Sequence, residues 1–180
     1  MIPKRVRDEM NEQVKYELES AYLYLSMVAW FHEQNLDGMA HWMRCQAHEE
    51  QIHAMKFFDH IVERGGTVHL LDLKQGKTSW LSPLEAWKDA YEHEQFVTGR
   101  CRLITKVVRE EDDYNAEPLM AWFNKEQIEE EANTSRVAAN LEMVGDNKQA
   151  ILMLDRELGA RVFPAGSPFD PLAYNAATAG

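Results

Sequence analysis

Residues that break helices are scarce in this sequence. Its 180 residues include only 9 glycines and 6 prolines, and Gly65-Gly66 is the only pair of adjacent glycines. Long stretches therefore contain nothing that would end a helix, while apolar residues, at 45%, are frequent enough to build a packed core. The composition predicts an all-α globular protein with one main domain.

Cysteine is also rare. Cys45 and Cys101 both fall within helical patterns, and the sequence contains no Cys-x-x-Cys. Rubredoxin-like, zinc-ribbon and thioredoxin-like sites are thereby excluded. We expect two free, buried and reduced thiols, as is usual in a cytoplasmic protein.

Positive charge and long apolar runs are lacking too. The sequence has 19 Lys and Arg residues but 30 Asp and Glu residues, which gives a net charge of −11. Nucleic acids and anionic membranes both require basic patches, so neither is expected as a partner. An acidic surface suits the attraction of cations, although it also serves simply to keep a protein soluble. No apolar run could span a bilayer, and the N-terminus lacks the apolar segment of a signal peptide, so a cytoplasmic location is expected.

The helical period recurs in four long segments and one short one. The expected helices cover about residues 3–32, 38–64, 82–109, 115–144 and 147–158. Residues 1–158 are then expected to form one domain, followed by an irregular tail over residues 159–180 that is rich in Pro, Ala and Gly.

Capping signals support the predicted helix starts. Ser82 and Glu85 fit a capping box at the start of the third helix, and Asn115 is the expected N-cap of the fourth helix. In the first helix, the core-facing stripe is expected to be widened by four further residues: Leu18, Tyr22, Leu25 and Ala29.

The connection between the second and third helices is unusually long. Residues 67–81 show no helical period. About 15 extended residues reach roughly 50 Å, whereas a helix of about 27 residues is about 40 Å long. This segment can therefore cross the height of a bundle and let the two helices run parallel, the long-crossover topology of ferritin-like bundles.

Polar side chains interrupt the apolar stripe of each long helix near its middle. In the second helix, Glu50 and His53 lie three residues apart on one face, within a stripe that includes Ala47 and Phe57. The corresponding residues of the other three helices are Glu17, Glu94, and Gln127 with Glu130.

A carboxylate on a core-facing stripe is unfavourable unless it is paired or binds a metal. Four buried carboxylates would repel one another, whereas two divalent cations would offset their charge. Carboxylates with one imidazole and no thiolate suit iron or manganese better than a structural zinc site. The alternative is a set of core carboxylates satisfied without metal.

Taken together, these residues resemble the ferritin family, specifically the bacterial non-haem ferritins, over about residues 5–158. The resemblance rests on the crossover and on Glu17, Glu50-Gln-Ile-His53, Glu94 and the segment Glu126-Gln127-Ile128-Glu129-Glu130-Glu131. It implies a di-iron centre in which Glu17, Glu50 and His53 hold the first iron, with Glu50 bridging. The second iron would be held by Glu94 and Glu130, with Gln127 beside it.

The resemblance also implies a third iron site, matched by Glu49, Glu126 and Glu129, with Glu130 shared. Tyr24 and Trp122 match aromatic residues that can give up an electron, although ordinary core packing explains them equally well. An acidic iron entry pore would be matched by Asp112, Asp113 and Glu117, which a solvated turn also explains.

Two departures from related families narrow the assignment. Bacterioferritin-like and rubrerythrin-like centres have a second Glu-x-x-His on the last long helix, where this chain has Gln127-Ile-Glu-Glu130. Bacterioferritins also carry a haem-ligating Met directly after the bridging Glu, where Gln51 stands here. No haem is therefore expected.

The resemblance implies iron storage with ferroxidase activity. Fe(II) would be oxidised by O2 and stored as ferric oxyhydroxide inside a hollow shell of twenty-four identical subunits. Two alternatives are a di-iron oxidase or peroxidase acting on a dissolved substrate, and an inert cage subunit. The first would require a second His and an open substrate pocket, and the complete set of ligands opposes the second.

Overall fold

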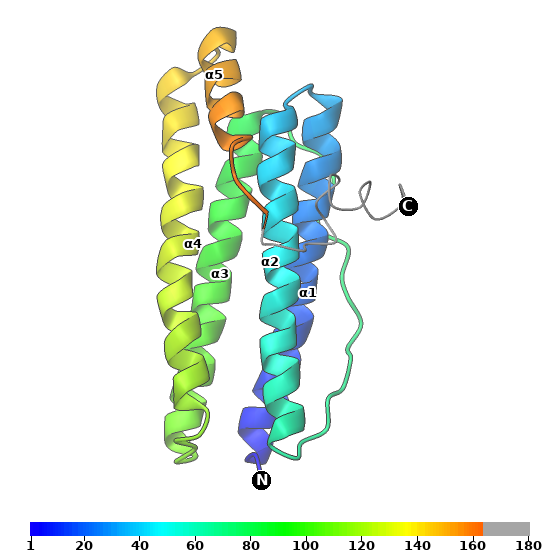
Figure 1. Ribbon diagram of the computed structural model, residues 1–180, viewed down its shortest axis with the longest axis vertical. Coiled ribbons are helices and arrows are strands. Elements are labelled where there is room, and N and C mark those ends of the chain that lie inside the picture. The colour runs from blue at the N-terminus through cyan, green and yellow to red at the C-terminus, as the bar shows by residue number, and fades with distance from the viewer. Residues whose placement is uncertain (164–180) are drawn as a thin grey trace, which may run out of the picture.

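The computed structural model describes residues 1–163 and contains five helices and no strands in that range. They are α1 (Lys4–Glu33), α2 (Asp37–Glu63), α3 (Pro83–Glu110), α4 (Glu117–Val144) and α5 (Lys148–Leu158). Figure 1 shows α1 to α4 side by side along the long axis, with α5 at one end. The predicted all-α four-helix bundle with a short fifth helix is confirmed. Residues 164–180 of the predicted tail lie outside the described residues.

The connections set the direction of each helix. Short turns join α1 to α2 and α3 to α4, so each of these pairs is antiparallel; Asn35 and Asp112, with φ of 58° and 50°, reverse the chain there. Residues 64–82 instead run along the outside of the bundle from one end to the other (Figure 1). Helices α2 and α3 therefore run parallel, as the crossover predicted.

Local sequence explains two of the helix starts. The Ser82 side chain accepts a hydrogen bond of 3.1 Å from the Glu85 backbone N–H. The Asn147 side chain caps α5 by accepting from two backbone N–H groups, at 3.1 and 3.2 Å. Both are N-caps of the kind expected for these residue types.

The predicted cap of α4 is wrong by one residue. Ala116, not Asn115, precedes the helix, and no side chain caps it. The Ala116 N–H is already bonded to the Asp113 carbonyl in the preceding turn, at 2.9 Å. Pro118 in the first turn has no N–H that needs a partner, so a side-chain cap is less necessary here.

The core consists of two apolar clusters separated by a polar layer, which contains the buried side chains of Glu17, Glu50, His53, Glu94, Gln127 and Glu130. One cluster, toward the end that carries α5, includes Met27, Met43, Trp87 and Leu141. The other, toward the N-terminal end of α1, includes Met10, Phe57, Ile104 and Phe123. Each fully buried side chain of this size contributes about 1.5–3 kcal/mol, so the clusters hold all four helices in register above and below the layer between them.

The predicted widening of the α1 stripe is wrong at three of its four residues; only Leu18 is half-buried and packs against the apolar cluster near the N-terminal end of α1. Tyr22 and Leu25 are 49% and 36% exposed, and Ala29 is also exposed. Helix α1 packs on α2 and α3, and the buried stripe through Ala21 and Tyr24 makes those contacts, which leaves the neighbouring face open. None of the helices within residues 1–163 is long and apolar enough to cross a lipid bilayer.

Candidate metal centre

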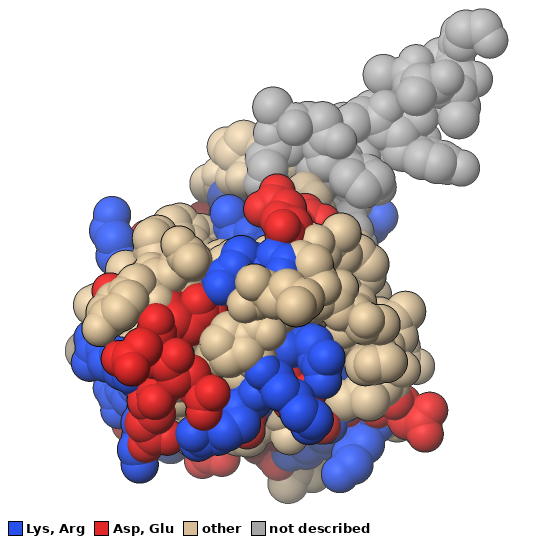
Figure 2. All heavy atoms as spheres, turned by 90° about the horizontal axis from the view of Figure 1, so that it is seen from below, with Lys and Arg blue, Asp and Glu red and all other residues tan. Residues whose placement is uncertain are grey.

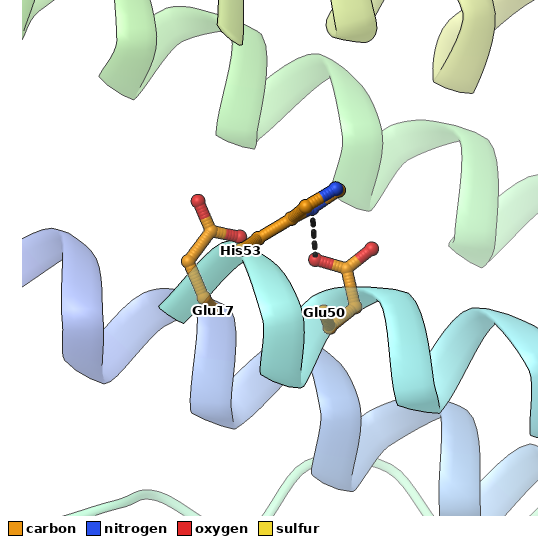
Figure 3. A group of neighbouring side chains, drawn as sticks. All are labelled: Glu17, Glu50 and His53. Carbon is orange, nitrogen blue, oxygen red and sulfur yellow. Dashed lines mark hydrogen bonds and ion pairs between the residues drawn. The ribbon is translucent and has the colours of Figure 1, made fainter. Parts of the chain in front are cut away.

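Three buried ligand-type side chains meet in the polar layer. Glu17 comes from α1, and Glu50 and His53 come from α2. Each offers a donor atom, and these atoms all lie within 4.8 Å of one another. Figure 3 shows the two carboxylates and the imidazole gathered in one space, with His53 Nδ1 3.3 Å from Glu50 Oε2. Two carboxylates and one imidazole within this distance can bind a single divalent cation.

A second group shares the same imidazole. His53, Glu126 and Glu130 also have donor atoms within 4.8 Å of one another, and both carboxylates come from α4. Glu130 is buried, whereas Glu126 is half-buried. The layer therefore contains donor atoms for more than one cation, contributed by helices that are far apart in sequence.

Glu94 brings α3 into the layer and is held from two sides. The Tyr24 hydroxyl donates to Glu94 Oε1. Gln127 Nε2 donates to Glu94 Oε2 at 3.2 Å and to the Glu94 carbonyl at 3.3 Å. All three residues are buried. Glu94 lies in neither three-residue group, but its carboxylate is oriented by α1 and α4 together.

Two glutamines that we had not singled out orient the other carboxylates. Gln13 Nε2 donates to Glu17 Oε1 at 2.9 Å. Gln46 Nε2 donates both to Glu50 Oε1 at 3.0 Å and to Glu130 Oε2 at 2.8 Å. In each case Gln lies four residues before Glu on one helix face. This repeated spacing was a signal that could have identified both residues from the sequence.

Among the candidate ligands, one buried carboxylate oxygen has no hydrogen-bond partner within residues 1–163. Glu17 Oε2 is fully buried and makes no hydrogen bond within the described residues. Leaving such an oxygen unsatisfied is unfavourable by about 1–3 kcal/mol or more, which a bound cation would offset. Together with the donor set of carboxylates and one imidazole, this orphaned oxygen shows that the residues fit a ferrous or similar divalent cation.

Burial and mutual repulsion shift the protonation of these groups. Burial, reinforced by the charge of Glu50, raises the pKa of Glu94 to about 8 and the pKa of Glu17 well above its usual range. Burial and then Glu94 likewise raise the pKa of Glu130. Carboxyl groups of this kind hold protons at neutral pH until a cation displaces them.

Glu50 and His53 behave in the opposite way, as an ion pair. Burial alone would raise the pKa of Glu50, but the adjacent imidazolium lowers it below its usual range. Burial likewise disfavours a charged His53, yet Glu50 and Glu17 together raise its pKa to about 10. Glu50 is thus the ionised carboxylate of the layer, which suits a ligand that bridges two cations.

The two aromatic residues named from the sequence both adjoin the layer. Tyr24 is buried and contacts Glu94. The Trp122 ring lies 5.5 Å from the His53 ring, centre to centre, and the Lys56 ammonium lies 4.2 Å above the indole. Both aromatics therefore lie next to candidate ligands.

The residues predicted to form a third iron site are only partly gathered. Glu126 and Glu130 lie together with His53, as described above. Glu129 is exposed, and Glu49 is half-buried and bonded to Arg161, a residue that no sequence pattern had indicated.

One acidic side chain of the turn between α3 and α4 is paired with a basic residue, which the sequence had not indicated. Asp113 is buried and forms an ion pair of 2.6 Å with Arg64, while Asp112 and Glu117 are exposed. Figure 2 shows this end of the molecule, where acidic side chains gather over one part and basic side chains lie directly beside them.

Comparisons with known proteins agree with this arrangement. A family model described as a ferritin-like domain matches residues 7–144. The bacterial non-heme ferritin of Bacteroides fragilis (strain 638R) is 33% identical over 161 residues, covering 89% of this chain and all of that protein. The bacterial non-heme ferritin of Staphylococcus aureus (strain USA300) is 31% identical over 163 residues, covering 91% of this chain and 98% of that protein. A solved open pore ferritin from the archaeon Archaeoglobus fulgidus superposes with a TM-score of 0.89 at 40% identity, covering 90% of this chain and 100% of that one. The chain belongs to the ferritin family.

Proposed function

We propose that this protein stores iron and that each subunit is a ferroxidase. The observation that carries the proposal is the buried group of Glu17, Glu50 and His53, in which Glu17 Oε2 has no hydrogen-bond partner within residues 1–163. Family membership supports iron storage in general. The donor set supports the more specific activity, oxidation of Fe(II) by O2.

In the proposed centre, Glu17, Glu50 and His53 bind the first Fe(II), and Glu50 bridges to a second. Glu94 and Glu130 complete the second position, with Gln127 beside it. Each Fe(II) gives one electron to O2, so two irons held side by side supply the two electrons that, with two protons, reduce O2 to hydrogen peroxide. Iron is a substrate here, and the oxidised product leaves for storage as ferric oxyhydroxide.

The surrounding residues orient ligands and handle protons. Gln13 and Gln46 donate hydrogen bonds that fix the carboxylates of Glu17 and Glu50. Protons held by Glu94 and Glu130 leave when cations enter, since only ionised carboxylates bind metal well. The two apolar clusters above and below the layer limit the access of water to the centre.

Three further assignments belong to the proposal. Glu49, Glu126 and Glu129, with Glu130 shared, form a third iron position. Tyr24 and Trp122 donate electrons when O2 is reduced beyond the two electrons of the iron pair. No haem takes part, because Gln51 stands where bacterioferritins carry their ligand.

We further propose that the chain assembles into a shell of twenty-four copies in the cytoplasm. The exposed apolar face of α1, with Tyr22 at 49% and Leu25 at 36% exposure, suits contact with another copy. The sequence has only two cysteines, Cys45 and Cys101, and both are buried, which suits a reducing compartment. The net charge of −11 opposes nucleic-acid and anionic-membrane partners.

The experiment that tests the proposal follows O2 consumption and iron retention together. Fe(II) is added to the assembled apoprotein, and dissolved O2 and protein-bound iron are both measured. A ferroxidase store consumes O2 in a fast phase and then co-elutes with ferric iron. An inert cage subunit would lack the fast phase, and an oxidase of dissolved substrates would not retain the iron.

A further inference from the structure

The segment that follows α5 folds back onto α2 and places an arginine beside the metal centre. Arg161 donates from Nη1 to Gln46 Oε1 at 2.9 Å and to the Trp42 carbonyl at 3.3 Å, and from Nη2 to Glu49 Oε2. Its guanidinium carbon lies 4.2 Å above the centre of the Trp42 ring. The side chains of Arg161 and Glu49 are only 19% and 29% exposed. Several directed contacts therefore hold the half-buried Arg161 side chain in place, unlike the side chain of an exposed surface ion pair.

The backbone around Arg161 is anchored as well. His41 Nε2 lies 2.6 Å from the Arg161 carbonyl oxygen, which accepts a hydrogen bond from it. The Phe163 ring packs edge-on against the His41 ring, 4.9 Å between centres, and Phe163 is buried. The arginine is thus held to α2 by its side chain, its carbonyl and a neighbouring aromatic residue.

A close helix crossing directs this segment toward α2. Gly38 lies so near α5 that a Cβ there would approach the Asp155 carbonyl oxygen to 1.8 Å. Asp155 Oδ1 in turn accepts a hydrogen bond of 2.8 Å from the Met39 N–H, at the start of α2. The end of α5 is therefore fixed against α2, and the chain leaving it passes directly to the Gln46 and Glu49 face.

Arg161 is linked to the ligands through one amide. Gln46 accepts from Arg161 with its oxygen and donates from its nitrogen to Glu50 and Glu130. The guanidinium thus lies one side chain away from Glu130 and in direct contact with Glu49, two of the residues assigned to the third cation position. The guanidinium therefore places a positive charge beside these carboxylates.

We propose that Arg161 competes with the third cation for Glu49. The guanidinium occupies the carboxylate oxygen that the cation would use, and its charge repels a divalent ion entering beside Glu130. A third cation therefore binds only when the Arg161–Glu49 pair opens, while the first two positions are filled independently. This inference rests on the proposed function, because it presumes cation binding by the neighbouring carboxylates.

The test titrates the assembled apoprotein with Zn²⁺, a redox-inert probe, by calorimetry, so that no step depends on oxidation. Arg161→Gln removes the charge while keeping a side chain that can contact Gln46. In this variant the third Zn²⁺ is expected to bind about tenfold more tightly than in the wild type, reflecting the loss of one charged hydrogen bond. Affinities of the first two cations should stay within about twofold.

Two further variants make the result specific. Arg156→Gln removes an exposed positive charge from α5, close in sequence, and should leave all affinities unchanged. Adding Glu49→Gln to Arg161→Gln should abolish the gain, since Glu49 is the ligand that was released. Thermal unfolding of each variant verifies that the bundle remains folded.

The outcomes separate this inference from the function on which it rests. Unchanged third-site affinity in Arg161→Gln would overturn the competition. Weakening of all three positions would overturn it too, by making Arg161 a support of the whole centre through Gln46. If neither the wild type nor the variant binds Zn²⁺ in the bundle, both the inference and the proposed metal centre fail. If the wild type and Arg161→Gln each bind two Zn²⁺ ions and no third, the proposed metal centre is supported and only the role of Arg161 is overturned.

Discussion

Gln46 on α2 donates a hydrogen bond of 2.8 Å to Glu130 on α4, while the same nitrogen donates to Glu50 at 3.0 Å. One amide thereby spaces two carboxylates that come from different helices and would otherwise repel each other. The bridge lies within the polar layer, between the two apolar clusters, where a lost donor cannot be replaced easily by water.

Replacing this amide should disturb the centre without unfolding the bundle. Gln46→Leu leaves both carboxylates without their shared donor, so we expect the initial rate of Fe(II) oxidation to fall about tenfold. Stopped-flow absorbance after mixing Fe(II) with the aerobic protein measures this rate. Gln51→Leu, on the same helix but in neither ligand group, serves as the matched control. Equal oxidation rates in the two variants would contradict a role for Gln46 in orienting the ligands.

Tyr24, which contacts Glu94 in the same layer, provides a second test. Tyr24→Phe deletes the hydroxyl that donates to Glu94 and keeps the ring that fills the core. We expect the assembled protein to form normally and the initial oxidation rate to fall severalfold, because Glu94 loses one of its two orienting donors. Tyr16→Phe, at a half-buried ring outside the layer, should retain the wild-type rate. A wild-type rate for Tyr24→Phe would show that Gln127 alone orients Glu94.

The raised carboxyl pKa values predict an unusual dependence of stability on pH. Glu94 has a pKa of about 8 in the native protein against an ordinary 4.5, and His53 about 10 against 6.5. In both cases the native state holds a proton that the unfolded chain has lost, so stability falls as pH rises through these windows. Thermal unfolding of the cation-free protein should therefore show a midpoint several degrees lower near pH 9 than near pH 5.

The same scans contain their own control. Zn²⁺ replaces the protons in the layer, so the loaded protein should lose most of this decline. Glu94→Gln, which cannot titrate, should show a smaller decline between about pH 4.5 and 8 than the wild type does. A midpoint that rises with pH in the cation-free protein would contradict the assignment of protonated carboxyls.

The crossing of α5 over α2 predicts a structural effect at a distance from the centre. Gly38→Ala places a Cβ at 1.8 Å from a backbone oxygen of Asp155, which only a shift of α5 can relieve. We expect a loss of about 1–3 kcal/mol in stability and faster proteolysis after residue 158. Gly99→Ala, where an added Cβ meets no atom within 4 Å in the same bundle, should not destabilise the protein. Identical proteolysis of the two variants would argue against this crossing.

Much of the centre could be predicted because helical periodicity fixes which residues share a face. Glu17, Glu94 and the Glu50–His53 pair all proved to be buried, as their positions in apolar stripes implied. Gln46 could have been identified by the same rule, since it lies four residues before Glu50.

Other features could not be predicted, for definite physical reasons. Arg161 reaches Glu49 from a non-helical segment 112 residues away, and no period relates the two. The exposure of Tyr22 depends on which faces of α1 are covered by α2 and α3, which a stripe alone does not specify. The cap of α4 was misplaced because the preceding turn, rather than a side chain, satisfies its backbone.

Glu50 and His53 are proposed to form part of a ferroxidase centre, and O2 consumption by Glu50→Ala tests this assignment. The variant and the matched control Glu63→Ala, an exposed residue of α2, are first shown to assemble like the wild type. Fe(II) is then added and the fast phase of O2 uptake is recorded. We predict that Glu63→Ala keeps this phase and that Glu50→Ala loses it, with a rate at least about 100-fold lower. A wild-type fast phase in Glu50→Ala would contradict the account.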